Sequence, residues 1–584
     1  MEAGLPWKSI TLGSGITAYS AVSSFSPRWS STAFTGYFVS TWVLSFVAWA
    51  CWKVILWPKV FSPLRGLPEP KNDSFFNGQW EKIRKLPNGV PMQQWIATIP
   101  NDGLIRYLGL LNQERLLIAS PKALAEVLVT KNYDFQKPAL MRLGLARILG
   151  YGILMTEGEE HKIQRRNLMP AFAFRHVKDL YPIFWSKAAE GVQAMTRQLL
   201  LDAAKDVDVS MTAPAGTTPV SEQQQPFQAN GNNSPETEGW TGELEVGVWA
   251  SRITLDIIGI AGMGRDFGAI ADPTNPLFQT YNVIFKPSRQ AQLLNLLGLF
   301  IPTWLLTRLP VQRNADVKGA AQTIRSTCAE LIREKKQKLA RKELTDVDIL
   351  SVALESGGFS DDNLIDQLMT FLAAGHETTA SSMTWAIYLL CRYPEIQTRL
   401  RQEVRERLPS IDDASATITS MDIDRMPYLN AVCSEVLRYF SPVPMTLREA
   451  AVETSIQGVK VPKGTRIILA ASGTNRDPAL WGSDSNQFNP DRWLSKHDGD
   501  KNAASGGATS NYALLTFLHG PRSCIGASFA KAEFACLLAT WIGKMKFELK
   551  NPEDADEDKL EIKGGVTQRP AKGMHVKVKV LDGW

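Results

Sequence analysis

No charged residue occurs between Arg28 and Lys53, and this gap constrains the folding of the chain more than any other feature. Within it, the apolar stretch from Ala33 to Trp52 is long enough to cross a lipid bilayer as a helix. Tryptophans suited to a membrane interface are followed by a cluster of positive charges, Lys53, Lys59, Arg65 and Lys71. We therefore predict a leader over residues 1–32, a single transmembrane anchor over 33–57 and a cytosolic position for the rest of the chain.

A cleavable signal peptide is the competing interpretation of this segment, because Ala48-Trp49-Ala50 matches a small-x-small cleavage pattern. The apolar run is too long for that, and only Lys8 and Arg28 supply positive charge before it. After the anchor, residues 58–71 contain four prolines. Prolines at this density favour an extended, stiff hinge that holds the following domain at a set angle to the membrane.

The composition of the chain indicates a packed globular protein, with 44% hydrophobic and 21% charged residues. The net charge of +5 over 584 residues is small and no block of like charges stands out, so nucleic acid is not expected as a partner. No two of the six cysteines are spaced as CxxC, which argues against a zinc site or a disulfide framework and for a reducing compartment.

Residues 72–584 are predicted to form one large domain, mainly α-helical with small β-sheets. A hairpin is expected over 105–120, turning at Asn112-Gln113, and Ser120-Pro121 is expected to cap a short helix. Helical patterns continue to about residue 440, and short strands appear near 454–470 and 562–580. Two polar stretches without apolar spacing, 211–240 and 497–511, are predicted to be disordered inserts.

Cys524 lies between a Gly-Pro-Arg turn and the start of a long predicted helix. A thiol at a helix start, beside the positive charge of Arg522, is expected to have a low pKa and to exist largely as a thiolate. Such a thiolate can act as a nucleophile, as half of a redox pair or as a metal ligand.

Four motifs in order narrow this choice: FLHGPRSCIG over 517–526, AGHET over 374–378, Glu435 with Arg438 three residues later, and Pro490-Asp491-Arg492-Trp493. With these motifs the chain resembles the cytochrome P450 family of haem-thiolate monooxygenases, and it is similar to fungal microsomal members. The resemblance covers roughly residue 62 to the C-terminus and implies the P450 fold with haem b as cofactor. It implies that the Cys524 thiolate is the axial ligand of the haem iron, which favours O–O cleavage.

The resemblance also implies which residues hold the haem. Phe517 is expected to shield the thiolate, and Gly520 and Gly526 are expected to let the backbone approach it closely. The residues expected to contact the haem propionates are Arg522, His161, Arg165 and Arg448, for which a surface ion pair is the alternative. His519 is interpreted as a polar loop residue.

A threonine inside a helix can bond its own i−4 carbonyl and open a groove. Thr378 is expected to do this and to donate to dioxygen, with Gly375 leaving room and Glu377 passing protons inward from solvent. His376 is interpreted as a packing residue, and Thr379 has no firm role. The buried network of Glu435, Arg438 and Arg492 is predicted to be structural, so that its loss would cost haem rather than change the chemistry.

The resemblance implies a monooxygenase that oxidises a lipophilic small molecule from a membrane-bound position at the endoplasmic reticulum. No flavin or dinucleotide fingerprint is present, so electrons are expected from an NADPH-dependent P450 reductase, with cytochrome b5 as a further donor. Terpenoid, polyketide or alkaloid intermediates of fungal secondary metabolism are the expected substrates, and fatty acids are the alternative. A haem-thiolate isomerase or dehydratase, and a non-catalytic haem binder, are the remaining alternatives. The basic set near 162–178 is either a docking face for an acidic partner or an ordinary solvated surface.

Overall fold

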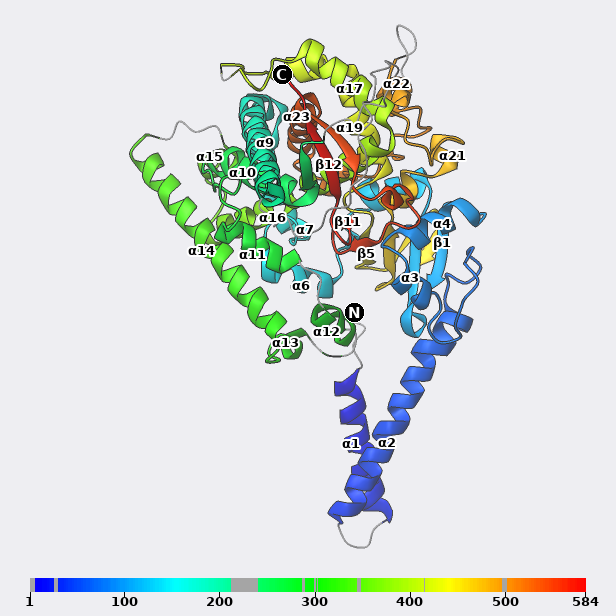
Figure 1. Ribbon diagram of the computed structural model, residues 1–584. Helices are drawn as coiled ribbons and strands as arrows, with labels where there is room; N and C mark the ends of the chain where they lie inside the picture. Colours follow the sequence, from blue (N-terminus) through cyan, green and yellow to red (C-terminus); the bar gives the residue numbers. More distant parts are fainter. Residues whose placement is uncertain are drawn as a thin grey trace, which may run out of the picture.

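The computed structural model describes residues 6–25, 30–211, 240–285, 289–298, 301, 303–343, 348–413, 415–495 and 502–584. Two antiparallel helices, α1 (Trp7–Phe25) and α2 (Ser31–Cys51), form a stalk below a large body (Figure 1). Ser30 caps α2, since its hydroxyl accepts a hydrogen bond from the backbone N–H of Ala33 at 3.3 Å. The span from Ser31 to Phe61 is apolar, and its most apolar 18-residue stretch contains no buried residue, as expected for a membrane anchor. Sequence analysis predicted this anchor but treated α1 as part of a leader.

The predicted hinge begins later than expected. Helix α2 continues as a π-helical segment, Trp52–Phe61, with Pro58 inside it. The wider hydrogen-bonding pattern of a π-turn tolerates the missing N–H of proline. The first four residues of the predicted 58–71 hinge are therefore helical, and the irregular chain begins at Ser62.

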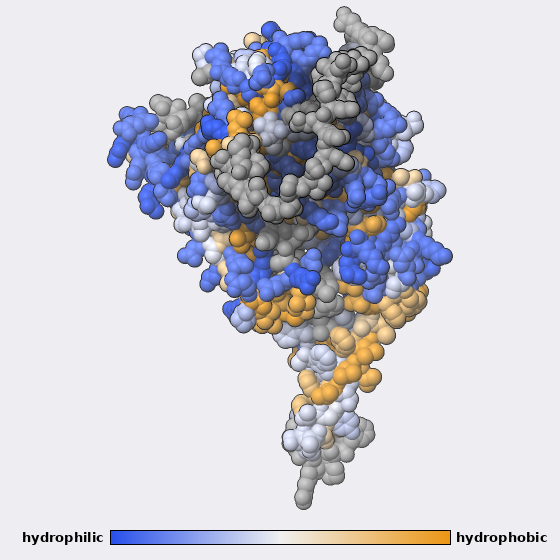
Figure 2. Space-filling view, in the orientation of Figure 1, coloured by the Kyte–Doolittle hydropathy of each residue, from blue (hydrophilic) through white to orange (hydrophobic). Residues whose placement is uncertain are grey.

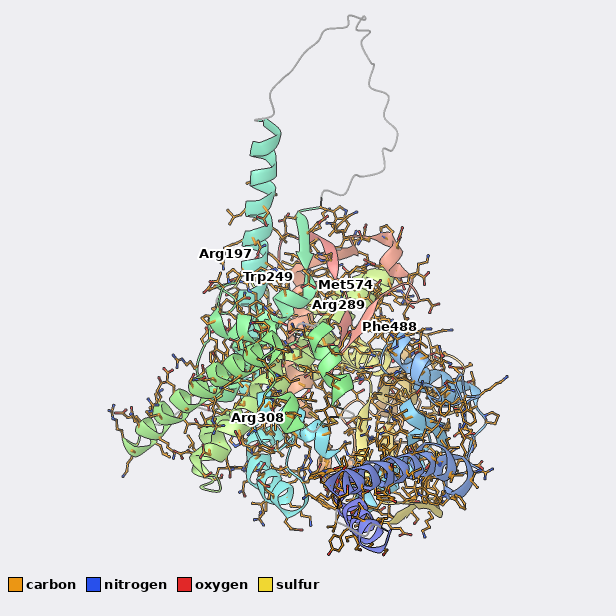
Figure 3. The ribbon with its side chains drawn as sticks, turned by 90° about the horizontal axis from the view of Figure 1, so that it is seen from below. Arg197, Trp249, Arg289, Arg308, Phe488 and Met574 are labelled. Atoms are coloured by element: carbon orange, nitrogen blue, oxygen red, sulfur yellow. The ribbon has the colours of Figure 1, made fainter. Side chains whose placement is uncertain are left out.

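The body combines a helix-rich part and a strand-bearing part, which lie side by side when the molecule is seen from below (Figure 3). The longer helices are α9 (Tyr181–Met211), α10 (Val246–Met263), α14 (Gln312–Ala340), α16 (Asp361–Arg392), α17 (Pro394–Arg407), α19 (Pro427–Tyr439) and α23 (Ala527–Lys544). The shorter ones are α3 (Trp80–Lys85), α4 (Val90–Thr98), α5 (Pro121–Ala125), α6 (Ala139–Leu149), α7 (Gly158–Leu168), α8 (Phe174–Val177), α11 (Pro276–Phe285), α12 (Arg289–Leu297), α13 (Thr303–Leu306), α15 (Ile349–Glu355), α18 (Ser420–Asp424), α20 (Ala471–Thr474), α21 (Pro478–Trp481) and α22 (Asn502–Ser505).

The strands form small sheets, as predicted. The largest has the order β1-β2-β8-β5-β3, in which β2 and β8 are parallel and the other neighbours antiparallel. A second sheet has the order β4-β12-β9, and β6-β7 and β10-β11 are hairpins. The strand bounds are β1 (Leu104–Leu108), β2 (Glu114–Ile118), β3 (Phe135–Gln136), β4 (Gly242–Glu245), β5 (Thr446–Ala450), β6 (Thr454–Ile456), β7 (Val459–Val461), β8 (Arg466–Leu469), β9 (Met545–Leu549), β10 (Ile562–Gly564), β11 (Gln568–Pro570) and β12 (His575–Val580).

The local predictions for the first hairpin are confirmed with one shift. Strands β1 and β2 pair antiparallel, but the turn between them places Leu111 and Asn112 at positive φ, one residue earlier than predicted. The Ser120 hydroxyl accepts from the backbone N–H of Ala123 at 3.2 Å, so Ser120 caps α5 as expected.

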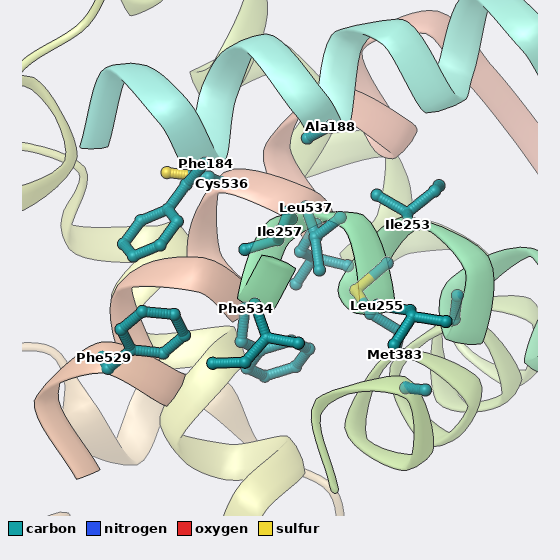
Figure 4. Close-up of a cluster of buried hydrophobic side chains, with 14 of the residues drawn as sticks. Phe184, Ala188, Ile253, Leu255, Ile257, Met383, Phe529, Phe534, Cys536 and Leu537 are labelled. Atoms are coloured by element: carbon teal, nitrogen blue, oxygen red, sulfur yellow. The ribbon is translucent and has the colours of Figure 1, made fainter. Parts of the chain in front are cut away.

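The core that supports the functional site lies among α9, α10, α16 and α23 (Figure 4). Phe184 of α9 meets Phe529 of α23 edge to face, with ring centroids 4.9 Å apart. Helix α10 is apolar enough to pass as a membrane span, yet it is almost entirely buried here. An apolar helix of this kind belongs to the interior of a large domain.

The two predicted inserts have different outcomes. Residues 212–239 and 496–501 lie outside the described residues, so the prediction of disorder stays untested for most of the first insert. The prediction is wrong for 502–511. There the chain forms α22 and turns, with Ala508 packed in the small cluster of Leu480, Trp481 and Ala513. A few small apolar residues are enough to fold this polar stretch, because they pack in the same cluster as the large side chain of Trp493.

The anchor is fastened to the body by a buried arginine. Arg106 of β1 is paired with the carboxylates of Glu69 and Glu114 and donates to the carbonyl of Pro58. The indole N–H of Trp57 donates to the same Glu114 at 3.1 Å. The end of the anchor helix is therefore held by charge-assisted hydrogen bonds rather than by a free hinge.

Candidate active site

The Cys524 loop is fixed by its own backbone. The N–H of Cys524 donates to the carbonyl of Phe517 at 2.8 Å, which closes the loop before α23 begins. Gly520 has φ +74°, and a Cβ there would lie 2.1 Å from the carbonyl oxygen of Leu128. Any other residue at 520 would push the loop off the segment that follows α5. By contrast, a Cβ on Gly526 would only touch Phe172 at an ordinary 3.7 Å. The protein part of the structure therefore requires a glycine at 520 but not at 526.

The predicted low pKa of Cys524 is wrong for the chain by itself. The Cys524 side chain has an exposed face, but protein surrounds most of it, and this desolvation raises the pKa of the thiol. The backbone N–H of Gly526 and the charge of Arg165 both lower the pKa, but they do not outweigh burial. A further positive charge at the sulfur, in addition to Arg165, is needed to keep Cys524 ionised as a thiolate.

Arg522, His161, Arg165 and Arg448 lie close enough to interact electrostatically, although they come from three separate parts of the chain. Their contact with haem propionates stays a prediction. The motifs did not point to two further cations, Lys137 and Arg142. Lys137 lowers the pKa of His161, and Arg142 lowers the pKa of Lys137. Within the described residues, the carboxylate of Glu157 is paired with Arg522 and lies 3.9 Å from the Lys137 ammonium. We call this set of residues 137, 142, 161, 165, 448 and 522 the cation cluster.

The cation cluster carries more positive charge than Glu157 can balance. This excess of positive charge helps to lower the pKa values of Lys137, His161 and Arg448. Burial, followed by the charges of Arg448 and Arg522, lowers the pKa of Lys137 to about 7. Burial and the neighbouring cations lower the pKa of His161 to about 4. Burial and Arg522 lower the pKa of Arg448 to about 10. A buried site with this excess of cations is suited to an anionic ligand.

Hydrogen bonds in the cation cluster leave donors available. Nδ1 of His161 is buried without a hydrogen-bond partner, and so is Nε of Arg522. Arg522 also donates to the carbonyl of Phe135 and lies over the ring of Tyr133. Arg165 donates to the carbonyl of Ser523 at 2.7 Å and to its hydroxyl at 3.1 Å, so it braces the residue before Cys524.

Helix α16 has a side-chain N-cap, and it has the predicted threonine geometry. The Ser360 hydroxyl accepts from the N–H of Asn363, and the Thr378 hydroxyl donates to the i−4 carbonyl of Ala374 at 2.9 Å. The role predicted for Gly375 differs from what the structure shows. A Cβ on Gly375 would lie 2.9 Å from Ile258, so the glycine is needed for close packing of α16 against α10.

Glu377 is held by residues that sequence analysis did not connect to it. It is buried and ion-paired with Arg569, and the Thr567 hydroxyl donates to its other oxygen at 2.8 Å. Burial raises the pKa of Glu377, and Arg569 lowers it. The Arg569 side chain is about one-third exposed (30%), so the ion pair extends from the buried Glu377 of α16 to the protein surface. The role of Glu377 in passing protons stays a prediction.

A second buried acid beside α16 escaped sequence analysis. Glu533 of α23 has no exposed surface, and the hydroxyl of Thr379 donates to one of its oxygens at 2.8 Å. The other oxygen has no hydrogen-bond partner. Burial raises the pKa of Glu533 to about 8, so the carboxyl is mostly protonated at neutral pH. His376 is buried against Tyr281, as expected for a packing residue.

The network of Glu435, Arg438 and Arg492 has the predicted geometry. Arg438 donates from Nε and Nη2 to both oxygens of Glu435, at 2.8 and 2.7 Å, and Arg492 donates to Glu435 at 3.2 Å. Trp493 adds an N–H bond at 2.9 Å that was not predicted. Arg438 also donates to the carbonyl of Asn475, whose side chain bonds both Leu515 and Thr516 just before the Cys524 loop. The network thus braces that loop through Asn475.

Comparison with known proteins identifies the family of this chain. The sequence model of the family Cytochrome P450 matches residues 227–576. The chain belongs to the cytochrome P450 family. It is 45% identical to Cytochrome P450 monooxygenase ALT8 of Alternaria alternata, over 92% of this chain and 93% of that protein. It is also 45% identical to Cytochrome P450 monooxygenase FUM15 of Gibberella moniliformis, over 91% and 90%. The crystal structure of a mutant cytochrome P450DA heme domain shares the fold, with a TM-score of 0.66 at 21% identity over 88% of this chain and 98% of that one.

P450 enzymes are haem-thiolate proteins, and the residues of this chain fit a haem. Cys524 presents an exposed sulfur beside a backbone N–H and Arg165. The cation cluster, with its unpartnered His161 and Arg522 atoms, matches the two carboxylates of a haem. Lys137 and Glu157 carried no recognisable sequence signal, because neither lies at a motif position or a helical spacing from the others.

Three largely aliphatic segments that are far apart in sequence come together at α16. The Thr370 hydroxyl donates to the carbonyl of Leu149 at the end of α6, and Ser381 donates to the carbonyl of Gln568 beside β11. The backbone N–H of Gln568 in turn donates to the carbonyl of Pro442. The segments near 140–155, 441–445 and 564–570 therefore lie around one face of α16.

Proposed function

We propose that this P450 is a membrane-anchored monooxygenase that inserts one atom of dioxygen into a lipophilic small molecule, with a fungal secondary-metabolite intermediate as substrate. The observation that carries the proposal is Cys524 set beside a buried cation cluster, with the Thr378 groove of α16 in the same domain. When bound, the haem held by Cys524 and the cation cluster activates dioxygen with electrons from a reductase.

The protein's own residues have separable tasks in this proposal. Arg522, Arg448, Arg165 and Lys137 would neutralise and orient the haem carboxylates, and the neutral imidazole of His161 would donate a hydrogen bond to them. Thr378 offers its hydroxyl to dioxygen, exchanging its bond to the Ala374 carbonyl for a bond to the ligand. Glu377, anchored by Thr567 and Arg569, receives protons from the surface side of α16.

Lipophilic side chains on the substrate segments support an apolar substrate. Leu140 and Leu143 of α6 are exposed although α6 packs near α16, and Leu154 follows in the next turn. Such a surface suits terpenoid, polyketide or alkaloid intermediates, and fatty acids would fit it as the second candidate.

A reductase docking face is proposed on α7, α8 and the turn between them. Lys162, Arg166, Arg175 and Lys178 are exposed there, beside the exposed apolar side chains of Ile163, Met169 and Phe174. Cations around an apolar centre suit an acidic flavoprotein partner in the same membrane, and cytochrome b5 would use the same face. The catalytic body then lies on the cytosolic side of the endoplasmic reticulum membrane.

The test is the carbon monoxide difference spectrum of the dithionite-reduced protein in membranes, followed by NADPH consumption with a P450 reductase. The expected result is a long-wavelength Soret band, which Cys524→Ala abolishes and Cys51→Ser, at the other exposed cysteine, retains. A short-wavelength band in freshly folded protein would contradict the thiolate site. A normal band without substrate-dependent NADPH consumption would instead favour an isomerase, a dehydratase or a haem carrier.

A further inference from the structure

Helix α1 packs against the anchor helix α2 in the lower part of the stalk, and the two helices spread apart toward the body (Figure 1). Its residues Ser14, Ala18 and Val22, spaced four apart, are almost completely buried. The indole N–H of Trp42 in α2 donates to the Thr11 hydroxyl at 3.2 Å, which fixes the register of the two helices. Small side chains at i, i+4 and i+8 allow this close approach, as they do between helices in membranes.

The outward face of α1 carries four large apolar side chains among serine, threonine and glycine. Trp7, Leu12, Ile16 and Tyr19 are each 57–67% exposed, and the stalk in Figure 2 shows pale to orange surface where the body shows deep blue. Thr17 bonds its own i−4 carbonyl at 2.9 Å, so its hydroxyl does not need water. Four large apolar side chains on one short helix form a surface that soluble proteins seldom expose to water.

The charges on α1 lie at the end nearest the body. Lys8 is the one charged residue between Trp7 and Phe25, and its ammonium lies 5.6 Å from the centre of the Trp7 ring. Because Thr11 lies beside Trp42 and the helices are antiparallel, Trp7 lies about one turn nearer the body, at the level of Phe46 in α2. Tryptophan and lysine at that level form an interfacial belt shared by both helices.

The dimensions of α1 match a bilayer. At about 1.5 Å per residue its 19 residues extend about 28 Å, close to the hydrocarbon thickness of about 30 Å. The span Ser31–Phe61 is apolar enough to insert by itself, whereas α1 is more polar and depends on its packing against α2. A helix packed along a membrane-spanning partner must share its depth.

We propose that α1 crosses the membrane beside α2, so that a two-helix hairpin holds the enzyme and the segment before Trp7 lies on the same side as the catalytic body. The occupant of the exposed α1 face is the acyl-chain interior of the bilayer. The connection over residues 26–29, which carries Arg28 as its one charge, then lies on the opposite side. This arrangement replaces the single crossing expected from sequence, and it rests on the membrane position of α2 in the proposed function.

Glycosylation mapping in microsomes tests the hairpin with the full chain. One version carries a flexible N-glycosylation cassette before Met1, and a second carries the same cassette within residues 26–29. We expect the second cassette to be glycosylated and the first to stay unmodified. The chain's own acceptor triplet at Asn72 serves as the internal control, since it lies on the catalytic side and should stay unmodified.

Glycosylation of the first cassette would overturn the proposal, because α1 would then not return across the membrane. Lack of modification at both positions would overturn it as well, because neither end of the hairpin would have crossed. Alkaline carbonate extraction separates these results from a failure of the membrane anchor itself, since an unanchored protein would be released. A carbon monoxide spectrum on each version confirms that the catalytic body is folded.

A matched pair of substitutions links the topology to the packing. Ala18→Phe places a large side chain on the face that contacts α2, and Ile16→Phe places the same side chain on the lipid face. We expect only Ala18→Phe to raise the fraction of molecules whose N-terminal cassette is glycosylated. Equal effects of the two changes would contradict packing against α2 as the cause.

Discussion

At the scale of single residues, Thr378 is the side chain whose removal should separate haem binding from oxygen chemistry. Its hydroxyl bonds the Ala374 carbonyl and holds no other side chain in place, so Thr378→Ala should leave the haem spectrum unchanged. We expect product formed per NADPH to fall about tenfold, with the electrons released as hydrogen peroxide. Peroxide yield per NADPH is the measurement. Thr378→Ser should restore coupling, and normal coupling in Thr378→Ala would remove Thr378 from the mechanism.

Glu533 gives a prediction for pH dependence. Burial raises its pKa from 4.5 to about 8, so between these values the folded protein holds a proton that the unfolded chain has lost. Stability should therefore fall as pH rises from about 4.5 to about 8, and the full cost should be present above that range. Glu533→Gln should flatten this fall and stabilise the protein by up to about 5 kcal/mol near pH 9.

Thermal unfolding midpoints across pH provide the check on Glu533. The control is Glu159→Gln, because Glu159 is exposed and paired only with Lys162 on the surface. That variant should follow the parent curve at each pH. An unchanged slope in Glu533→Gln would show that the buried acid is paired by a group outside its Thr379 contact.

At the scale of elements, the clamp on the anchor should be separable from the catalytic site. Arg106→Leu leaves the carboxylates of Glu69 and Glu114 without their buried cation and frees the Pro58 carbonyl. Breaking such a pair costs about 3–5 kcal/mol. We expect faster tryptic cleavage at Lys59, Arg65 and Lys71 with the haem spectrum retained. Arg84→Ala, at an exposed ion pair, is the matched control and should not alter cleavage.

Short-range motifs within single elements could be predicted from the sequence, whereas contacts between distant segments could not. The Cys524 loop, the Glu435–Arg438 pair and the Ser360 cap were predictable because each is a short-range pattern with a fixed spacing. Lys137, Glu157 and Arg569 were not, because their roles arise from contacts between segments far apart in sequence. Burial of the Cys524 thiol could not be judged either, and so its pKa was predicted in the wrong direction. Helix α1 was missed because its apolar face is interrupted by serine, threonine and glycine.

At the scale of the whole molecule, the cation cluster should couple haem binding to global stability. Its members come from α6 and the segment before it, from α7, from β5 and from the Cys524 loop, so their mutual repulsion opposes the joining of distant parts of the chain. A bound dianionic haem turns this repulsion into a net attraction, because the cations then face negatively charged carboxylates. Haem-free protein should accordingly be much less stable, and added phosphate should recover part of the loss.

The decisive variant is Arg448→Gln, measured by urea unfolding in haem-loaded and haem-free protein. Arg448 is 2% exposed, and its bonds within the chain go to Thr446 and the Leu447 carbonyl. Removing its charge should destabilise the haem-loaded form by on the order of 2 kcal/mol, because a carboxylate loses its partner. The same change should stabilise the haem-free form, because one charge leaves a repelling cluster. Arg476→Gln removes an arginine paired with Glu557, so it should destabilise both forms. If Arg448→Gln destabilised both forms equally, Arg448 would be a structural cation and the propionate assignment would fail.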